Sequence, residues 1–367
     1  MRWALWLILF FNMVSAQKSP KISWKEAASF SEFPENLGLA GMAAAKTDGG
    51  FLIAGGANFP NGLPWEGGKK FFSDKIFQWD GTEKAPRLNN LRLPEGLAYS
   101  GFVSSGRELV IIGGETASGP SKKVLAITNS GIRQLPDFPL AVIAPAVVAV
   151  GKNIYVAGGD MASETSNKFF VLNLDNENAG WKELPALPNR TANAAIFGLK
   201  DKIYLASGRS KNKNGISTLN DEIYAFDLKL NQWCKIGKVQ VNGNESPFVA
   251  SSYFTWKNRY LVFCGGDDGK TFHQIETYLS KISAASNERE KSNLTDQKNY
   301  LVKHHQGFNN RILIYDTKSG KWLSEEFLPF PAQVTTATVA SDDKIYIFSG
   351  EVRPGVRSPM IRRATIK

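Results

Sequence analysis

A short motif recurs six times along the chain: an apolar, strand-like run that ends in a small residue followed by glycine. The copies read FLIAGG, LVIIGG, IYVAGG, IYLASG, YLVFCGG and IYIFSG, and they end at Gly56, Gly114, Gly159, Gly208, Gly266 and Gly350. Most copies are followed by a second strand-like run, a polar turn and a tryptophan, as in EIYAFDLKLNQW and RILIYDTKSGKW. A repeated unit of this kind cannot bury its apolar face alone, so neighbouring copies must stack on one another.

This pattern is typical of the blades of a kelch-type β-propeller. We therefore predict an all-β fold with six blades, each a four-stranded antiparallel meander around a central channel. Glycine pairs suit strand ends where backbones crowd, and a tryptophan on each outer strand would supply packing area between blades. The second copy carries Ile132 in place of this tryptophan. A helical fold is not expected, because no long apolar pattern with a 3.6-residue period appears.

The last copy contains one strand too few. After Gly350 the segment IRRATIK supplies a third strand, and no tryptophan-bearing strand follows it. The segment KISWKEAASF, with Trp24, lies near the N-terminus and has the missing pattern. We predict that this N-terminal strand completes the last blade, because ring closure removes the sheet edge that an open stack would expose.

Residues 1–16 have the features of a secretory signal peptide: Arg2, the apolar run WALWLILFFNMV, and a small-residue end. We expect cleavage after Ala16, which leaves residues 17–367 as a single propeller domain. The apolar run is short for a membrane span, and no cysteine follows it, so no membrane anchor is expected. The protein is expected to be exported, to the periplasm of a Gram-negative bacterium or otherwise into the medium.

The formal net charge of +10 suits an anionic ligand. Nucleic acid is not expected, because no compact run of lysine and arginine is interleaved with aromatic residues. Cys234 and Cys264 each adjoin a strand-like run and are interpreted first as small apolar residues, with one disulfide left open. No metal site is predicted at His304 and His305, because adjacent residues of a strand point to opposite faces.

Two insertions lengthen the repeats: ANFPNGLPWEGGKKFFS after Gly56, and residues 267–308. Both follow the second strand of a blade, so they share one rim with the connections between blades. Symmetry places the residue after each glycine pair around the channel mouth on this rim. These residues are Ala57, Glu115, Asp160, Arg209, Asp267 and Glu351. We expect this rim to be the working face.

The turn SGEVRPGVRS contains the strongest candidate site. It places Glu351, Arg353 and Arg357 on a turn that Pro354 and Gly355 restrict. An arginine that faces a glutamate favours the ionised carboxylate, and it can also bind the carboxylate of a ligand through two parallel hydrogen bonds.

The same turn resembles the Gly-Glu-x-(Lys/Arg)-Pro-Gly-x-Arg turn of the sialic acid mutarotases, also called N-acetylneuraminate epimerases. The stretches IIGGETASG and AGGANFPNG…GGKK resemble two further parts of that family. The C-terminal position of the turn is similar to that in the cyclically permuted mutarotase group. The resemblance covers essentially the whole chain after residue 16. It implies a six-bladed propeller that interconverts the α and β anomers of N-acetylneuraminate outside the cytoplasm.

The resemblance also implies roles for individual residues. Glu351 corresponds to the family's essential glutamate, and we expect it to act as the base. Arg357 corresponds to the essential arginine, and we expect it to bind the sugar carboxylate or to stabilise the developing charge. The other residues expected to bind substrate are Arg353, Glu115, Arg209 and Asn58. Anomer exchange needs only general acid and base help, so no metal and no cofactor is expected.

The interpretation of the protein as an isomerase leaves two alternatives. An exported sugar-binding module without catalysis would have no need for the glutamate–arginine turn, whereas a mutarotase of another sugar would fit the residues equally well. A copper radical oxidase is not expected, because it would need tyrosine, histidine and cysteine ligands in a longer chain. The expected partner is a small anionic sugar, and the sequence leaves a homodimer open.

Overall fold

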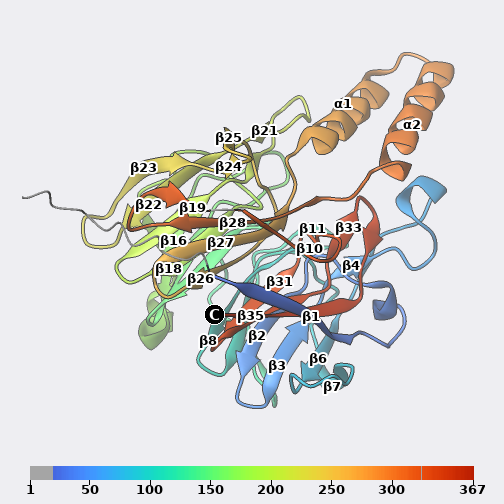
Figure 1. The fold of residues 1–367 in the computed structure, drawn as a ribbon. Coiled ribbons are helices and arrows are strands. Elements are labelled where there is room, and N and C mark those ends of the chain that lie inside the picture. The colour runs from blue at the N-terminus through green and yellow to red at the C-terminus, as the bar shows by residue number, and fades with distance from the viewer. Residues whose placement is uncertain (1–19, 324) are drawn as a thin grey trace, which may run out of the picture.

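The computed structural model describes residues 20–323 and 325–367, so the expected signal peptide lies outside the described residues. Six antiparallel sheets are arranged around a central channel (Figure 1). This confirms the predicted six-bladed propeller. Its second strands are almost fully buried, as in Gly50–Ala54 and Tyr260–Gly266. Apolar side chains occupy both faces of these strands because each blade is packed between two others.

Four strands form each blade and run from the channel outward. Blade one contains β2 (Ala43–Thr47), β3 (Gly50–Ala54), β6 (Lys75–Trp79) and β7 (Arg87–Arg92). Blade two contains β8 (Gly101–Ser105), β9 (Glu108–Ile112), β12 (Val124–Ile127) and β13 (Ile132–Leu135). Blade three contains β14 (Ala146–Val150), β15 (Asn153–Ala157), β16 (Phe169–Asn173) and β17 (Lys182–Leu184).

The remaining three blades repeat this plan. Blade four contains β18 (Ala195–Leu199), β19 (Lys202–Ala206), β22 (Glu222–Asp227) and β23 (Gln232–Lys238). Blade five contains β26 (Ser252–Trp256), β27 (Tyr260–Gly266), β28 (Asn309–Asp316) and β29 (Lys321–Trp322), and β30 (Glu326–Phe327) also pairs with β28. Blade six contains β31 (Ala337–Ser341), β32 (Lys344–Phe348), β35 (Met360–Ile366) and β1 (Ile22–Ser29).

The N-terminal strand closes the ring, as predicted. β1 pairs antiparallel with β35, from Ile22 opposite Ile366 to Ser29 opposite Met360. The two strands lie side by side in Figure 1, one blue and one red. The Trp24 ring packs edge-on against Phe330, with ring centroids 5.4 Å apart.

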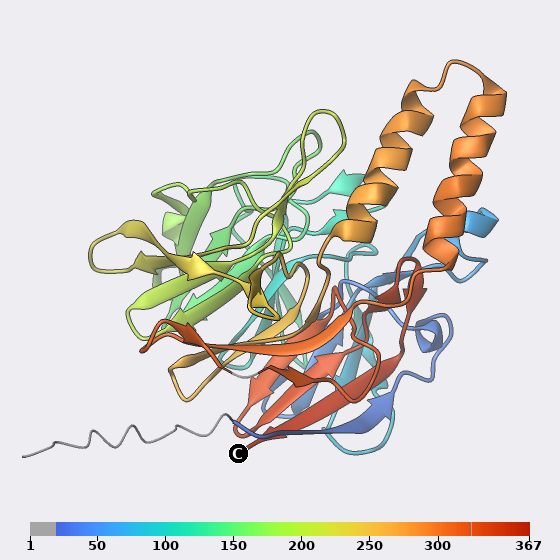
Figure 2. The ribbon, with the colours of Figure 1, turned by 45° about the horizontal axis from the view of Figure 1, so that its top comes forward.

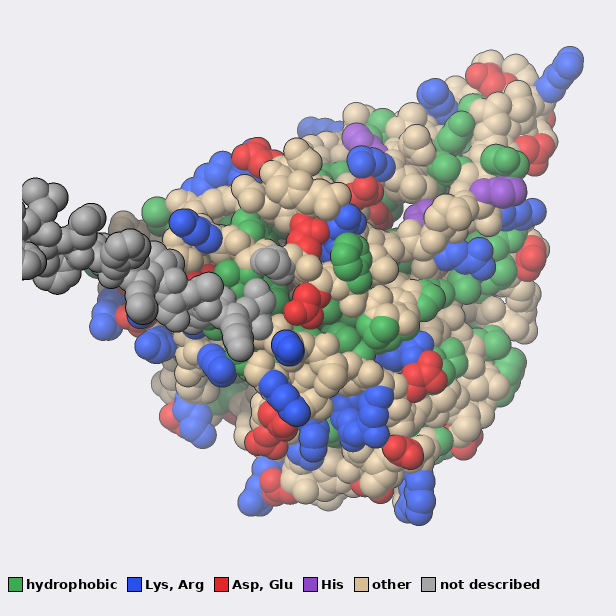
Figure 3. Space-filling view, in the orientation of Figure 1, with side chains coloured by type: hydrophobic (Ala, Val, Ile, Leu, Met, Phe, Trp, Pro, Cys, Tyr) green, Lys and Arg blue, Asp and Glu red, His purple; other side chains and the backbone are tan. Residues whose placement is uncertain are grey.

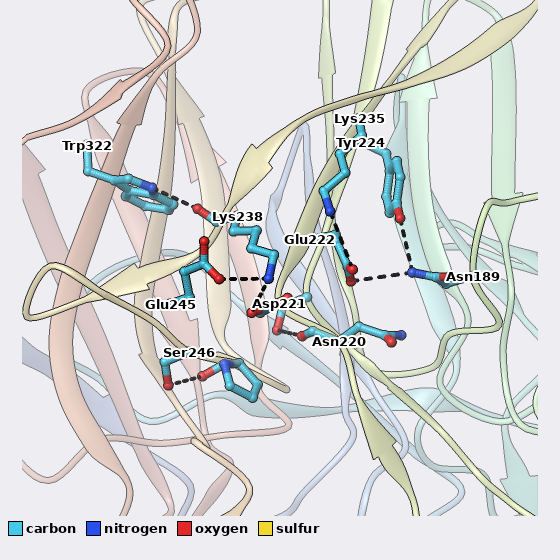
Figure 4. Close-up of polar contacts among 12 residues, drawn as sticks. Asn189, Asn220, Asp221, Glu222, Tyr224, Lys235, Lys238, Glu245, Ser246 and Trp322 are labelled. Atoms are coloured by element: carbon cyan, nitrogen blue, oxygen red, sulfur yellow. Dashed lines mark hydrogen bonds and ion pairs between the residues drawn. The ribbon is translucent and has the colours of Figure 1, made fainter.

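Tryptophans join successive blades. Trp181, Trp233 and Trp322 lie at the outer strands of blades three, four and five, and each indole Nε1 donates to a carbonyl oxygen of the preceding blade. The acceptors are Pro136 at 2.9 Å, Pro185 at 3.2 Å and Lys238 at 3.0 Å. Figure 4 shows the third of these bonds. Blade one differs from the prediction, because Trp79 lies in β6, the third strand. It is buried there against Phe51 rather than packed between blades from the outer strand.

The first residue of every glycine pair has a positive φ, between 50° at Ser349 and 67° at Gly55. The chain passes so close to the next blade here that a Cβ on Gly158 would lie 2.0 Å from the carbonyl oxygen of Thr191. Serine replaces glycine in two copies and uses its hydroxyl instead. The Ser349 Oγ accepts a hydrogen bond from the Leu39 backbone N–H at 2.7 Å. Backbone crowding therefore explains the motif that identified the fold.

Six backbone hydrogen bonds form a closed ring around the channel. We call this the backbone ring, and its members are Gly41, Tyr99, Ala144, Asn193, Ala250 and Thr335. The N–H of each member donates to the carbonyl oxygen of the member in the preceding blade, at 2.7 to 3.2 Å. All six residues have positive φ. The ring joins every blade to its two neighbours and makes the base of the channel mouth rigid.

The insertion at residues 267–308 is helical, which the sequence analysis did not predict. α1 (Lys270–Ala284) and α2 (Glu288–Lys303) form a hairpin that projects from the rim (Figures 1 and 2). The assumption that His304 and His305 lie on a strand is therefore wrong, because they follow the last turn of α2. In residues 20–323 and 325–367, no cluster of three or more His, Cys, Asp or Glu side chains could hold a metal ion. No described helix has the length and apolar character to cross a membrane.

Both cysteines are free thiols, so they do not form the disulfide that the sequence left open. Cys264 is buried in β27, as expected for a small apolar residue. The same interpretation is wrong for Cys234, which is exposed on the outer strand β23. On the face shown in Figure 3, lysine and arginine side chains are interspersed with aspartate and glutamate.

Candidate active site

The six residues that follow the glycine pairs surround the channel mouth, as symmetry predicted. Each forms an isolated β-bridge with the residue that immediately precedes a member of the backbone ring. The bridges join Ala40 to Ala57, Ala98 to Glu115, Ile143 to Asp160, Ala192 to Arg209, Val249 to Asp267 and Val334 to Glu351. The backbone ring thereby fixes the backbone position of each of these six residues at the mouth.

The structure brings Glu351 and Arg357 together. They are register partners in a hairpin of β33 (Glu351–Arg353) and β34 (Val356–Arg357). The Glu351 Oε1 accepts a hydrogen bond from the Gly355 N–H at 2.6 Å, and the Arg357 Nη1 donates to it at 3.4 Å. The hairpin tip packs on the blade-one insertion, where a Cβ on Gly355 would lie 3.0 Å from Pro64. The turn and this packing therefore hold the carboxylate in one position.

The guanidinium of Arg357 is buried but incompletely bonded. The Arg357 side chain is 5% exposed, and its Cζ lies 4.8 Å from the ring centroid of Phe59. Its Nη2 donates to the Tyr99 hydroxyl at 3.4 Å, while its Nε is buried without a hydrogen-bond partner among the described residues. Buried donors normally have partners. The Arg357 Nε is therefore a donor whose hydrogen-bonding capacity is unused.

Glu115 lies on the same mouth and is paired with a lysine. The Lys70 Nζ, from the blade-one insertion, donates to the two Glu115 carboxylate oxygens at 3.1 and 2.9 Å. The same ammonium lies 5.4 Å from the ring centroids of both Phe72 and Tyr99. Glu115 thus lies on the side of the mouth that Tyr99 links to Arg357.

Arg209 lies farther around the mouth, beside α1. Its Nη2 is 2.5 Å from the Asp160 Oδ2, and its Cζ is 5.6 Å from the ring centroid of Phe272. A pocket of about 300 Å³ is lined by residues that include Glu115, Asp160 and Arg209. The helical hairpin therefore forms one wall of the mouth, with Glu276 of α1 also facing this pocket.

The structure does not bring Arg353 and Asn58 into this group. Arg353 is exposed near the tip of its hairpin. Burial lowers the pKa of His305, and the nearby charge of Arg353 lowers it further, so this arginine lies toward the end of α2. The Asn58 side chain is buried, and its amide donates to the carbonyl oxygens of Pro34 at 2.7 Å and Gly38 at 3.0 Å. These contacts hold a loop, and a substrate role for Asn58 remains a prediction.

Asp267 occupies the mouth position of blade five, next to Glu351. Burial raises the pKa of Asp267 to about 6, although the Gly269 N–H donates to its Oδ1 at 2.8 Å and opposes the shift. The negative charges of Asp268 and Glu351 raise this pKa further. The mouth therefore holds a carboxyl group whose pKa lies well above its ordinary range.

Sequence reasoning missed Tyr99, Lys70 and Phe59. Lys70 belongs to the GGKK stretch, which was quoted only as part of the family resemblance. Tyr99 could have been found by aligning the copies at the position two residues before each inner strand. The other five copies have small or medium-sized side chains at this position, namely Gly41, Ala144, Asn193, Ala250 and Thr335.

Comparison with known proteins relates the chain to one family. The sequence model of the N-acetylneuraminate epimerase family matches residues 135–367. An N-acetylneuraminate epimerase of Haemophilus influenzae (strain PittEE) is 24% identical over 240 residues, which cover 63% of this chain and 59% of the relative. N-acetylneuraminate epimerase 1 of Escherichia coli O6:H1 is 26% identical over 248 residues, which cover 64% and 60%.

A third relative has a less specific name. A Kelch domain-containing protein of Vibrio cholerae serotype O1 is 25% identical over 235 residues, which cover 64% of each chain. The chain thus spans less than two thirds of the length of the curated relatives that it matches. The matched segment includes Glu351, Arg357, Arg209 and Asp267 but neither Tyr99 nor Lys70.

Proposed function

The chain belongs to the N-acetylneuraminate epimerase family, and on that premise we propose that it is an isomerase that interconverts the α and β anomers of N-acetylneuraminate. The observation that carries this proposal is the buried, incompletely bonded guanidinium of Arg357 beside the Glu351 carboxylate. An anionic sugar with a carboxylate on its anomeric carbon meets both groups at once. The guanidinium binds the carboxylate, and Glu351 then faces the anomeric hydroxyl.

The chemistry needs few groups. Glu351 accepts the proton of the anomeric hydroxyl while the bond between the anomeric carbon and the ring oxygen breaks. The resulting open-chain ketone rotates about the bond next to the carbonyl carbon. The ring oxygen then attacks the opposite face of the carbonyl, and the Glu351 carboxyl group returns its proton to the new anomeric oxygen. General acid and base catalysis typically contributes about 10²- to 10⁴-fold, which is a sufficient gain for a reaction that already proceeds slowly in water.

Arg357 has two functions in this scheme. Its planar guanidinium can bind the sugar carboxylate with two parallel hydrogen bonds, which fixes the position of the anomeric carbon. Its positive charge also attracts the negative charge that develops on oxygen as the ring opens. We further propose that the protein is exported, on the basis of the signal-like residues 1–16.

Proton NMR of freshly released α-N-acetylneuraminate tests the function. We expect the β anomer to appear faster in proportion to the concentration of protein. Freshly dissolved α-glucose is the control, and because it has no carboxylate for Arg357 to bind, its exchange should not be accelerated. An unchanged rate for N-acetylneuraminate would contradict the proposal. Equal acceleration of both sugars would favour a mutarotase of broader specificity, and tight binding without acceleration would favour a sugar-binding module.

A further inference from the structure

Tyr99 is the exceptional member of the backbone ring. The other five members have small or medium-sized side chains, whereas Tyr99 carries an aromatic ring. Its φ is 53°, a conformation that bulky residues rarely adopt. The backbone hydrogen bonds on both sides, from the Tyr99 N–H to Gly41 and from the Ala144 N–H to Tyr99, hold it there.

The direction of the Tyr99 side chain follows from its contact with Gly41, its neighbour in the backbone ring. A Cβ on Gly41 would lie 2.5 Å from the Tyr99 Cδ1, so the aromatic ring occupies the space that a side chain of blade one would fill. The side chain therefore extends from blade two across blade one toward blade six. There its hydroxyl accepts the hydrogen bond from Arg357 at 3.4 Å.

Charged groups of both signs influence the Tyr99 side chain. Arg357 contacts it, and the Lys70 ammonium is 5.4 Å from the ring centroid. Burial raises the pKa of Tyr99 to about 12, and the charges of Glu351 and Glu115 add to this increase against the opposing effect of Arg357. The phenol therefore keeps its proton at neutral pH. No acceptor for this proton is found among residues 20–323 and 325–367.

We propose that Tyr99 is the catalytic acid that protonates the ring oxygen of the sugar while Glu351 removes the proton of the anomeric hydroxyl. This inference rests on the proposed function. As the bond between the anomeric carbon and the ring oxygen breaks, its electron pair takes the phenol proton, and the anomeric C–O bond becomes the carbonyl. On ring closure, the phenolate takes this proton back, and the Glu351 carboxyl group returns its proton to the new anomeric oxygen. No proton is gained or lost overall.

Two other groups at the mouth, Arg357 and Asp267, are poorer proton donors for this step. An arginine guanidinium does not give up its proton in proteins, so Arg357 can stabilise charge but cannot act as the acid. Asp267, with its pKa of about 6, has lost most of its proton at neutral pH. A phenol is a weak acid, but the alkoxide of an opening ring is a stronger base than a phenolate. Arg357 and Lys70 can then stabilise the phenolate that forms.

The test compares Tyr99→Phe with Tyr253→Phe. Tyr253 is the matched control. Burial also raises its pKa to about 12, but no charged side chain contributes to this shift. The α-to-β exchange rate of N-acetylneuraminate is measured by NMR for each variant. Binding of its methyl α-glycoside, which cannot open its ring, is measured by calorimetry. We expect Tyr99→Phe to lower kcat about 10²-fold and to leave the glycoside affinity unchanged, and we expect Tyr253→Phe to retain the wild-type rate.

Each other outcome has a defined meaning. Wild-type exchange by Tyr99→Phe would overturn the assignment of the acid while leaving the proposed function intact. Loss of glycoside binding together with the rate would make Tyr99 a binding residue and would also overturn the assignment. Equal losses in both variants would point to a general disturbance of the channel and would count against a specific role. A wild-type protein that does not accelerate the exchange would refute both the function and this inference.

Discussion

Glu351 and Arg357 differ from an ordinary surface ion pair in their degree of burial. Their side chains are 16% and 5% exposed, whereas those of Arg107 and Asp48, in the turns that follow the inner strands of blades two and one, are 82% and 64% exposed. Exposed pairs contribute little because water screens them. A buried pair with an unused donor can interact strongly with a charged ligand, because water screens it less. This burial separates the candidate catalytic pair from the exposed ion pairs of the protein.

Substitutions at this pair should separate catalysis from binding. Glu351→Gln retains an acceptor for the Gly355 N–H but removes the base, so we expect kcat to fall by about 10²- to 10⁴-fold with glycoside binding retained. Arg357→Lys keeps the charge and loses the two-point geometry, so we expect mainly a higher KM. NMR exchange rates at several sugar concentrations measure both effects. Arg107→Lys is the control, and a wild-type rate for Glu351→Gln would remove the base from the mechanism.

Asp267 should make stability depend on pH. Its pKa is higher in the folded state, about 6 against an ordinary 3.8, so the folded protein binds more protons between these values. The free energy of unfolding is therefore expected to fall as pH rises from about 4 to about 6, by on the order of 2 kcal/mol from this group. Urea denaturation at several pH values measures this. Asp267→Asn should flatten the slope, whereas Asp268→Asn should reduce it only slightly, because it removes one of the smaller causes of the shift. An identical slope in Asp267→Asn would assign the pH dependence to other groups.

The helical hairpin belongs to blade five in sequence, but it is anchored to blade four. The Glu276 carboxylate of α1 accepts hydrogen bonds from the Ser217 N–H at 2.7 Å and from its hydroxyl at 2.8 Å. The N-terminus of α1 is also tightly packed, because a Cβ on Gly269 would lie 2.1 Å from Leu219. Phe272, one turn before Glu276, lies over Arg209. These contacts make α1 a fixed wall of the mouth.

Removing this anchor should loosen α1 selectively. Glu276→Ala leaves the Ser217 donors without their acceptor, so we expect faster amide hydrogen exchange in residues 270–284 and a KM that rises a few-fold with little change in kcat. Glu276→Gln is the control, because its carbonyl oxygen can still accept one of the two bonds, and it should show a smaller effect. Unchanged exchange in Glu276→Ala would mean that the apolar contacts alone hold the helix.

The whole molecule is closed twice. The backbone ring joins all six blades at the channel, and the β1–β35 pairing joins the two ends of the described chain. Lys21 and Lys367 extend this pairing, with backbone hydrogen bonds in both directions at 3.2 and 3.1 Å. Blade six is therefore complete only when segments from both ends of the chain meet, so stability near either end depends on the other.

Deletion of residues 17–30 tests this closure. The truncation removes β1 and exposes β35 as a sheet edge, and it removes the contact between Trp24 and Phe330. We expect the Tm to fall by roughly 10 °C, because several kcal/mol are lost and each changes the Tm of a large domain by about 2–4 °C. Trp24→Ala keeps the strand pairing and should cost less. A truncated protein with the same Tm as the wild type would show that β1 contributes nothing to the stability of the propeller.

The sequence alone determined the number of blades, the strand that closes the ring, the symmetric positions at the mouth, and the pairing of Glu351 with Arg357. These features are local or periodic: strand alternation, crowding at the glycine pairs, and a six-residue spacing on one turn. The helical hairpin was missed because it is an insertion that the repeat does not specify, and none of its helical residues except Val302 is buried.

Only the tertiary structure decided which side chains meet at the mouth. Asn58 was expected at the substrate but donates to the loop that contains Pro34 and Gly38. Tyr99 was not expected there, yet it reaches Arg357, 258 residues away in sequence. The physical reason is that a side chain extends into whatever volume its neighbours leave empty. Between blades, that volume exists only once the ring is closed, and no pattern within a single repeat specifies it.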